Sequence, residues 1–541
     1  MDKSLFKFER PENEAPLSYA PGTKEREELQ KELKRQSEMQ VEIPLIIGGK
    51  EIKTGDLGDV VMPHDHKHVL GKYHKAGKKE VQMAIDAAMK AKEEWEHTPW
   101  IDRASIAMRV AELITTKYRY LMNASTMLGQ SKTPHQAEIE AVAEAADFHR
   151  FNSHYMGKIY AEQPLSVDGI INRTEYRPLE GFVFAVTPFN FTAIASNLPM
   201  APALMGNVSV WKPATTSLLS NYYLMKIYQE AGLPDGVINF VPGKGSVIGG
   251  ECLSSEHLGG LHFTGSKGTF DYLWKSIGKN IENFKQYPRI VGETGGKDFV
   301  IAHPSSDVDE VATALVRGAF EYQGQKCSAA SRAYIPKSMW DNVLKRMKEM
   351  VAEIKMGDVT DFSTFMGAVI DEASFDNIAG FLENAKKDKD AEIVIGGNAD
   401  KSEGFFIEPT VILAKDPKYI TMEEELFGPV LTVYVYEDEK YSETLELLDN
   451  TSIFGLTGAV FARDRYAVVE AEKKLSHAAG NFYINDKPTG AVVGQQPFGG
   501  SRSSGTNDKA GSVLNLSRWI SQRAIKETLN PPTDFKYPYM G

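Results

Sequence analysis

Apolar residues recur with the period of an α-helix over 80–95, 106–113 and 136–151. In the first of these segments Val81 and Ile85 lie four residues apart, which places them on one face of a helix. The pattern predicts long amphipathic helices whose apolar faces are buried.

After residue 180 short, β-rich apolar runs alternate with helical segments. Strands are predicted over 182–186, 208–211, 237–241, 260–263, 290–293, 298–302 and 482–484, with helices that include 217–231 and 307–320. Strand, helix, strand at this rhythm predicts a doubly wound, mostly parallel sheet. Ligands of such sheets bind beyond the carboxyl ends of the strands. Asn190, Lys212, Gly265 and Ser266 follow predicted strand ends, so one crevice is expected to bring them together.

The chain has 541 residues, which predicts two or three domains. A formal net charge of -12 argues against a nucleic-acid partner. The uncharged run 187–211 is broken by prolines and asparagines, so no membrane span is expected.

Two cysteines cannot form a disulfide framework, and no clustered His/Cys pattern predicts a metal site. Residues 1–14 mix both charge signs and fit neither a secretory signal nor a mitochondrial presequence. We therefore expect a bacterial cytoplasmic protein, or a mitochondrial matrix protein if a presequence has been removed.

Cys327 lies in a glycine-broken loop among polar residues, beside Lys326. A lone cysteine is most simply a small buried hydrophobe. The polar neighbours argue against a core position, and a neighbouring cation is expected to lower the pKa of a thiol. We interpret Cys327 as a covalent catalyst.

Two further residues have chemistry that a cysteine catalyst needs. Glu293 stands at a predicted strand end in a glycine-rich turn, where a carboxylate can approach a ligand closely. Asn190 offers an uncharged amide donor for a developing oxyanion. Taken alone, each residue has a structural interpretation as well. Glu293 could be an exposed carboxylate in a turn, and Asn190 could be a buried amide whose hydrogen bonds are satisfied.

Seven short motifs in chain order resemble those of the aldehyde dehydrogenase superfamily, from about residue 45 to the C-terminus. They are Thr187-Pro-Phe-Asn-Phe-Thr, Trp211-Lys-Pro-Ala, Phe263-Thr-Gly-Ser, Gly292-Glu-Thr-Gly-Gly-Lys, Gly324-Gln-Lys-Cys-Ser, Glu424-Glu-Leu-Phe-Gly-Pro and Pro497-Phe-Gly-Gly. Further sequence segments resemble the branch of this family that oxidises L-glutamate γ-semialdehyde. It includes Phe320-Glu-Tyr-Gln-Gly-Gln-Lys-Cys-Ser-Ala, Asn481-Phe-Tyr-Ile-Asn-Asp-Lys and Val493-Gly-Gln-Gln-Pro-Phe-Gly-Gly.

The resemblance implies an α/β fold with a Rossmann-type NAD-binding domain, an α/β catalytic domain and a small β oligomerisation flap. The implied division is an N-terminal arm over 1–40, an NAD-binding domain over 41–160 and 181–296, and a catalytic domain over 297–510. The flap and C-terminal arm would take 161–180 and 511–541. A homodimer or dimer-based assembly follows from the resemblance, and a proline dehydrogenase is a possible partner.

The resemblance assigns the chemistry as well. Cys327 would attack the aldehyde carbon, and the Asn190 amide with the Cys327 main-chain N–H would hold the oxyanion of the thiohemiacetal. One such donor is worth roughly 3 kcal/mol of barrier. Hydride transfer to NAD leaves a thioester, and Glu293 would activate the water that hydrolyses it to glutamate.

For the cofactor, the resemblance gives contacts to Thr187, Lys212, Gly265, Ser266, Lys267, Gly268, Thr269 and Glu425. Ser266 would open a helix whose N-terminus meets the pyrophosphate. Many NAD-preferring relatives carry a glutamate three residues after the lysine, where this chain has Thr215. An acid there would repel a 2′-phosphate, so NADP stays an alternative and NAD is predicted from the branch.

For the substrate, the resemblance gives Glu144, Phe191, Ser328, Gly490, Ala491 and Phe498. The α-carboxylate would meet Ser328 and the loop main chain at 489–491, and the two phenylalanines would flank the aliphatic part. The branch usually has serine at the position of Ala491, so one hydroxyl donor is missing here.

Three alternatives remain. The chain could be an aldehyde dehydrogenase for another carboxylated semialdehyde, a catalytically silent binding protein on this fold, or a cysteine hydrolase without cofactor. The joint presence of Cys327, Glu293 and Asn190 argues against a silent protein, and the nucleotide-site motifs argue against a hydrolase.

Overall fold

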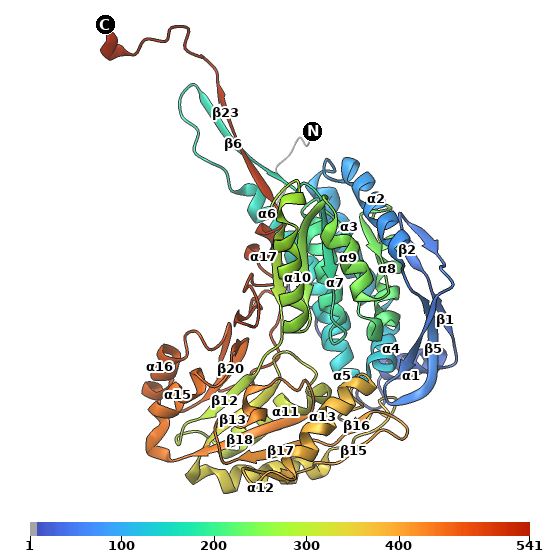
Figure 1. Cartoon of the computed structure of the whole chain (residues 1–541), viewed down its shortest axis with the longest axis vertical. Coiled ribbons are helices and arrows are strands. Elements are labelled where there is room, and N and C mark those ends of the chain that lie inside the picture. The colour runs from blue at the N-terminus through green and yellow to red at the C-terminus, as the bar shows by residue number, and fades with distance from the viewer. Residues whose placement is uncertain (1–7) are drawn as a thin grey trace.

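The computed structural model describes residues 8–541 and is built on two seven-stranded sheets, each packed against helices (Figure 1). The first sheet has the order β11-β10-β7-β8-β9-β2-β3. Its strands are β11 (Arg289–Glu293), β10 (Leu258–Thr264), β7 (Phe182–Val186), β8 (Val208–Lys212), β9 (Ile238–Phe240), β2 (Leu45–Ile47) and β3 (Lys50–Ile52). From β11 to β9 all pairs are parallel, and β2 is antiparallel to both its neighbours. The predicted doubly wound, mostly parallel sheet is confirmed.

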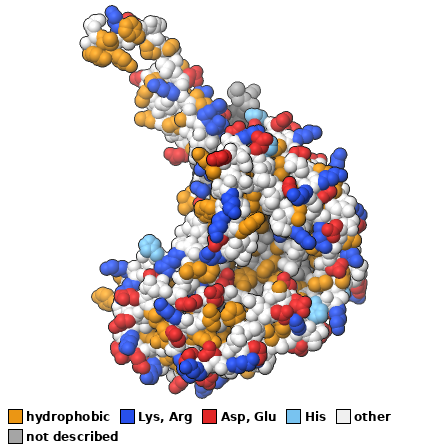
Figure 2. All heavy atoms as spheres, in the orientation of Figure 1, with side chains coloured by type: hydrophobic (Ala, Val, Ile, Leu, Met, Phe, Trp, Pro, Cys, Tyr) orange, Lys and Arg blue, Asp and Glu red, His pale blue; other side chains and the backbone are white. Residues whose placement is uncertain are grey.

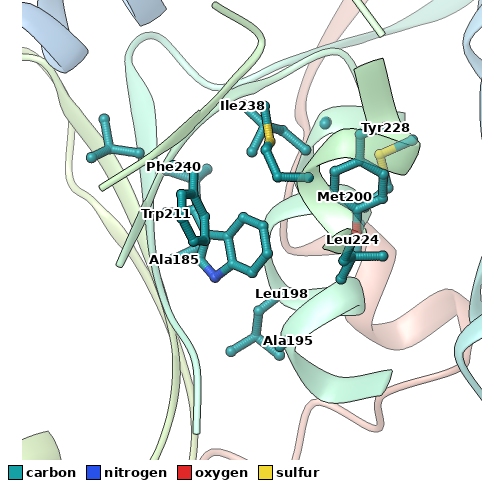
Figure 3. Close-up of a cluster of buried hydrophobic side chains, with 14 of the residues drawn as sticks. Ala185, Ala195, Leu198, Met200, Trp211, Leu224, Tyr228, Ile238 and Phe240 are labelled. Atoms are coloured by element: carbon teal, nitrogen blue, oxygen red, sulfur yellow. The ribbon is translucent and has the colours of Figure 1, made fainter. Parts of the chain in front are cut away.

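Helices around this sheet bury its apolar strands. They include α7 (Thr192–Leu204), α8 (Leu218–Glu230), α9 (Gly245–Ser254) and α10 (Lys267–Lys279). Figure 3 shows Trp211 of β8 at the centre of one buried cluster, among residues of α7 and α8. Its ring lies edge-on to Phe240, with the ring centroids 5.1 Å apart. The uncharged run 187–211 is therefore buried protein, and no helix among residues 8–541 is long and apolar enough to cross a membrane.

The second sheet has the order β14-β17-β18-β13-β12-β20-β21, and only β14 is antiparallel to its neighbour. Its strands are β14 (Ala391–Ile395), β17 (Thr410–Ala414), β18 (Val430–Tyr436), β13 (Ala330–Pro336), β12 (Asp298–Ala302), β20 (Thr457–Phe461) and β21 (Asn481–Ile484). Two separate cores flank it. One contains residues of α11 (Val308–Phe320) and α12 (Lys337–Glu353), the other residues of α13 (Glu372–Ala385), α15 (Tyr441–Asp449) and α16 (Arg465–Lys474).

The helices that precede the first sheet are α2 (Lys78–Trp95), α3 (Trp100–Thr115), α4 (Arg119–Gln130), α5 (Pro134–Ala137) and α6 (Ala145–Ala161). The single helix expected over 136–151 is interrupted by a π-helix, η1 (Glu138–Glu144). Glu138 and Glu140 are both buried, although residues two apart point in different directions on a regular α-helix. Glu138 pairs with Arg119 of α4, and Glu140 with Lys132. The wider π-turn lets both acids face the protein interior, which the sequence period did not reveal.

The two ends of the chain join the body in different ways. Near the N-terminus lie α1 (Lys24–Ser37) and a sheet of β1 (Val41–Ile43), β5 (Asp65–His74) and β4 (Leu57–Met62). Near the C-terminus, α17 (Val513–Ser517) is followed by β23 (Ser521–Thr528), which pairs antiparallel with β6 (Ile170–Arg177). This two-stranded arm projects from the body and carries the C-terminus at its far end (Figure 1).

Leu516, Trp519 and Ile520 belong to the first core, so the arm expected over 511–541 starts within the body. The division into domains stays a prediction. The remaining short elements are α14 (Ile420–Glu423), β15 (Ala399–Asp400), β16 (Phe406–Ile407), β19 (Phe454–Gly455), β22 (Ser501–Arg502) and the 3-10 turns η2 (Thr215–Ser217), η3 (Ile281–Asn283), η4 (Glu321–Gly324), η5 (Asp438–Lys440) and η6 (Pro538–Met540).

Candidate active site

The carboxyl ends of the parallel strands of the first sheet meet at one edge. Strand β7 leads to Thr187 and Asn190, β8 ends at Lys212, β10 leads to Ser266, and β11 ends at Glu293. Because β7, β8, β10 and β11 run parallel, these residues gather where the topology predicts a ligand.

The backbone just before Cys327 is held in a rare conformation. Tyr322, Gln323 and Gly324 have φ angles of 52°, 54° and 64°, three successive left-handed residues between α11 and β13. Hydrogen bonds fix this turn: the Gln323 amide donates to the main-chain carbonyls of Ser131 and Ala368, at 3.0 and 2.7 Å. Strain of this kind persists only where the surroundings determine it, and it concentrates at functional sites.

An oxyanion site is available beside the thiol. The Nδ2 of buried Asn190 donates one hydrogen bond, to the carbonyl of Gln325 at 3.1 Å, and its second N–H has no partner in the described part of the chain. Among residues 8–541 the main-chain N–H of Cys327 has no hydrogen-bond partner. The Asn190 amide, which follows the first sheet, and the Cys327 N–H, which precedes a strand of the second, therefore both remain available to an incoming oxygen.

The thiol of Cys327 is not activated in the way its sequence neighbours suggest. Burial raises its pKa well above the ordinary value, and the carboxylates of Asp298, Glu425, Glu293 and Glu144 raise it further. The lowered pKa expected from the neighbouring Lys326 is not found, because the burial and carboxylate effects prevail; the Lys326 ammonium itself pairs with the buried carboxylate of Glu321 at 3.2 Å.

Glu293 ends β11 and is close enough to Cys327 for its charge to raise the pKa of the thiol. Its Oε2 accepts a hydrogen bond from the main-chain N–H of Gly500 at 2.9 Å. Burial raises the pKa of this carboxyl well above its usual value, against the lowering effects of the Gly500 bond and the Lys509 charge. Lys509 in turn donates to the carbonyls of Gly480 and Gly499, at 2.8 and 3.0 Å, and so supports the turn that holds Glu293. A carboxyl with a raised pKa suits a general base near neutral pH.

The crevice has features that fit a dinucleotide. The ammonium of half-buried Lys212 has no hydrogen-bond or ion-pair partner among the described residues, and burial lowers its pKa to about 8. Ser266 caps α10 by accepting from the main-chain N–H of Thr269 at 3.4 Å. A Cβ on Gly245, at the start of α9, would meet nothing within 4 Å. A cation without a partner among the described residues and a capped helix N-terminus suit ribose hydroxyls and phosphate.

The other predicted cofactor residues take these positions. Thr187 accepts from the indole N–H of Trp211 at 3.0 Å, which links the crevice to the core of Figure 3. Glu425 accepts from the main-chain N–H of Gly296 at 2.9 Å, and burial raises its pKa to about 7. Lys267 pairs along α10 with Asp271 at 2.6 Å, and no residue blocks the space beside Gly268.

The predicted substrate residues lie on a loop and on helices around the thiol. We call residues 489–498 the substrate loop. The hydroxyls of Ser328 and Thr489 are hydrogen-bonded at 2.8 Å, so the loop is fastened directly beside the nucleophile. Gly490 has φ +105°, and neither its N–H nor that of Ala491 has a partner among residues 8–541. Two adjacent free N–H groups form a site for a carboxylate, even without the serine hydroxyl missing at Ala491.

The three remaining predicted substrate residues are Glu144, Phe191 and Phe498. Burial, followed by the Glu140 charge, raises the pKa of Glu144 to about 8. Phe191 stacks on the fully buried Lys132, whose ammonium lies 4.6 Å from the ring centroid. Phe498 pairs with Ala510 across an isolated bridge.

Sequence reasoning missed two buried lysines. Burial, the Arg332 charge and nearby acids set the pKa of Lys297 at about 7, and its ammonium has no partner among residues 8–541. Lys297 belongs to the Gly292-Glu-Thr-Gly-Gly-Lys motif, and that motif could have indicated it as a candidate site residue. Lys132 pairs with Glu140 at 2.5 Å, and nothing in its sequence setting indicates burial. Within residues 8–541 no group of acids, histidines and cysteines is arranged to hold a metal.

The chain belongs to the aldehyde dehydrogenase family, whose pattern matches residues 52–525. Among its relatives, the mitochondrial Delta-1-pyrroline-5-carboxylate dehydrogenase of Dictyostelium discoideum is 53% identical over 98% of this chain and 96% of its own length. The mitochondrial enzyme of that name from Homo sapiens is 49% identical over 98% of this chain and 94% of its own. The solved structure of Delta-pyrroline-5-carboxylate dehydrogenase from Mycobacterium tuberculosis bound with NAD has a TM-score of 0.96 at 49% identity, over the whole of both chains. These comparisons confirm the predicted family and fold.

Proposed function

We propose that this protein oxidises L-glutamate γ-semialdehyde, the open form of Δ1-pyrroline-5-carboxylate, to L-glutamate with NAD, as the second step of proline degradation. The observation that carries the proposal is the surroundings of Cys327. Among residues 8–541, N–H donors without partners lie beside the thiol, and the Glu293 carboxyl, whose pKa is raised, is close enough to act on the thiol electrostatically. The substrate loop, with two further N–H groups that have no partner among these residues, is fastened to Ser328.

In the proposed reaction the Cys327 thiol gives its proton to solvent water, and its sulfur bonds to the aldehyde carbon as the C=O π bond opens. The resulting alkoxide is held by the Asn190 amide and the Cys327 N–H. NAD, when bound, accepts the hydride and supplies positive charge that favours the thiolate. The thioester that remains on Cys327 is hydrolysed by a water whose proton passes to Glu293, and glutamate leaves.

The substrate loop supports a carboxylated substrate. The α-carboxylate would bind the N–H groups of Gly490 and Ala491 and the hydroxyl pair of Ser328 and Thr489. A hydrogen bond to a charged group is worth on the order of 1.5–3 kcal/mol, so these contacts would separate this substrate from a plain aldehyde. Another carboxylated semialdehyde is the second candidate, because the same contacts would bind it.

A substrate panel tests the proposal. Purified protein with NAD is given glutamate γ-semialdehyde, succinate semialdehyde and propanal, and NADH is followed by absorbance. We expect the highest kcat/KM with the first. No NADH from any of the three would refute an aldehyde dehydrogenase, and equal values would refute the substrate assignment. Repeating the panel with NADP tests cofactor preference at Thr215.

We further propose a homodimer joined through the two-stranded arm. Figure 2 shows apolar side chains gathered at the end of the arm, where Leu529, Phe535, Tyr537 and Tyr539 are exposed. Exposed apolar groups of this extent favour association. Sedimentation is expected to give about twice the chain mass of 60.0 kDa.

The supply of substrate and the compartment are also proposals. A proline dehydrogenase would supply the imine. The structure is similar to that of proline utilization A from Bdellovibrio bacteriovorus, at 29% identity and a TM-score of 0.91. The match covers 96% of this chain but 53% of that one, which supports the proposal because the larger protein has a further part beyond the matched region. The compartment would be a bacterial cytoplasm, or the mitochondrial matrix as the names of the eukaryotic relatives state for them.

A further inference from the structure

Asn13 joins three parts of the chain that are far apart in sequence. Its Nδ2 donates to Oδ2 of Asp147 on α6 and to the carbonyl of Val493 in the substrate loop, both at 2.8 Å. Its Oδ1 accepts from the side-chain amide of Gln495 at 2.9 Å. One amide thus makes two bonds to the substrate loop and one to the helix behind it.

The N-terminal segment around Asn13 is itself firmly held. The main-chain N–H of Glu14 donates to the other oxygen of Asp147 at 2.9 Å, and the Glu14 carboxylate pairs with Arg119 and Arg150 at 2.9 and 2.8 Å. Asp147 is buried, and its partners Asn13, Glu14 and Arg150 are half-buried. The anchor that Asn13 offers to the loop is therefore fixed to the body of the protein.

The substrate loop has other contacts as well: Val493 is buried in the first core, and the main chain of Phe498 is bonded to that of Ala510. Gly494 has φ +81°, and a Cβ there would lie 2.1 Å from the ring of Phe151 on α6, so the loop runs tightly over that helix. Arg10 adds one longer bond, at 3.3 Å, to the carbonyl of Gly494. At its other end the loop is tied to Ser328 through Thr489. The loop is thus held at Thr489 by the nucleophile turn, at Val493 and Gln495 by Asn13, and at Phe498 by Ala510.

We propose that Asn13 is a positioning residue for recognition of the substrate carboxylate: it holds the substrate loop so that the N–H groups of Gly490 and Ala491 keep the spacing a carboxylate needs. This inference rests on the proposed function. Residues that precede the Rossmann-type core would then set substrate selectivity without touching the substrate or the thiol.

The test compares glutamate γ-semialdehyde with propanal, which has no carboxylate. For Asn13→Ala we expect KM for the semialdehyde to rise about tenfold with kcat within about twofold, while KM for propanal stays within about twofold. Asn450→Ala is the matched control, since that amide caps α15 by donating to the Glu446 carbonyl and, among residues 8–541, makes no bond to the substrate loop. It is expected to leave both KM values unchanged.

A second variant covers the case in which Asn13→Ala fails to fold. Gln495→Ala removes one bond of the same junction, and KM for the semialdehyde alone is expected to rise about threefold. If both variants fold, the double variant should show less than the product of the two effects.

Three outcomes overturn the inference: no change in KM for the semialdehyde in either variant, an equal rise for propanal, or fully multiplicative effects. Failure of the proposed function is distinguishable, because wild-type protein would then show no preference for the carboxylated aldehyde.

Discussion

The side-chain amide of Asn190 donates a hydrogen bond to the carbonyl of Gln325 at 3.1 Å. Asn190 follows β7 of the first sheet, and Gln325 lies two residues before Cys327 in the turn that enters the second sheet. This hydrogen bond therefore joins the oxyanion donor that follows the first sheet to the nucleophile turn that precedes the second sheet.

Replacing Asn190 with alanine is expected to lower kcat by about 10²–10³-fold, because one of two donors to the developing oxyanion is lost. The dissociation constant for NAD, measured by fluorescence titration, should change less than about twofold. An unchanged kcat would remove Asn190 from the oxyanion site. Asn221→Ala, at a buried amide on α8 that bonds only Ser217, is the control for loss of a buried amide.

Glu293→Gln should uncouple the two halves of the reaction. Acylation does not need the base, so mixing with NAD and aldehyde is expected to give one equivalent of NADH in a burst, followed by a slow steady rate. The pKa of Glu293 is raised by burial, so the wild-type steady rate should increase with pH as this carboxyl loses its proton. Stopped-flow absorbance measures both phases. A variant with the wild-type steady rate would contradict this assignment.

The two cysteines should differ sharply toward iodoacetamide. Cys252 is fully buried, and burial raises the pKa of its thiol well above the usual range. Cys327 is half-buried. Mass spectrometry is expected to find the label on Cys327 only, at a rate that rises with pH up to at least pH 9 because burial and nearby carboxylates raise its pKa. Rapid labelling at pH 6 would contradict this prediction.

Glu321 should contribute stability that is lost in acid. Burial raises the pKa of Glu321, but Lys326 and Arg317 outweigh it and bring the pKa to about 2, below the ordinary 4.5. A carboxyl whose pKa is lower in the folded protein stabilises the fold at any pH above its unfolded-state pKa. That stabilisation is lost as the pH falls toward its folded-state pKa. The difference corresponds to about 3 kcal/mol.

Urea unfolding midpoints of wild type and Glu321→Gln measure this contribution between pH 7 and pH 3. The gap between the two proteins is expected to be largest at pH 7 and to narrow below about pH 4.5. A gap that stays constant with pH would show that the ion pair with Lys326 contributes no net stability. Glu383→Gln, at an exposed pair with Lys386, is the control and should shift the midpoint little.

Sequence alone determined the alternation of strands and helices. Strand β12 and the helix capped by Asp307 were predicted from local signals, the apolar run 298–302 and a capping side chain. The motifs around Asn190, Glu293 and Cys327 also stand in the sequence, because close approach of main chain to ligands restricts residue types locally. The assignment of roles to these three residues stays a prediction.

Only the tertiary structure decided how these residues are tuned. Lys326 is adjacent to Cys327 in sequence but is paired with Glu321, while Asp298, Glu425 and Glu144 come from distant segments and raise the pKa of the thiol. The role of Asn13 depends on contacts with residues more than 130 positions away. Electrostatic and hydrogen-bond energies depend on distance and burial in three dimensions, and neither quantity can be read from neighbours along the chain.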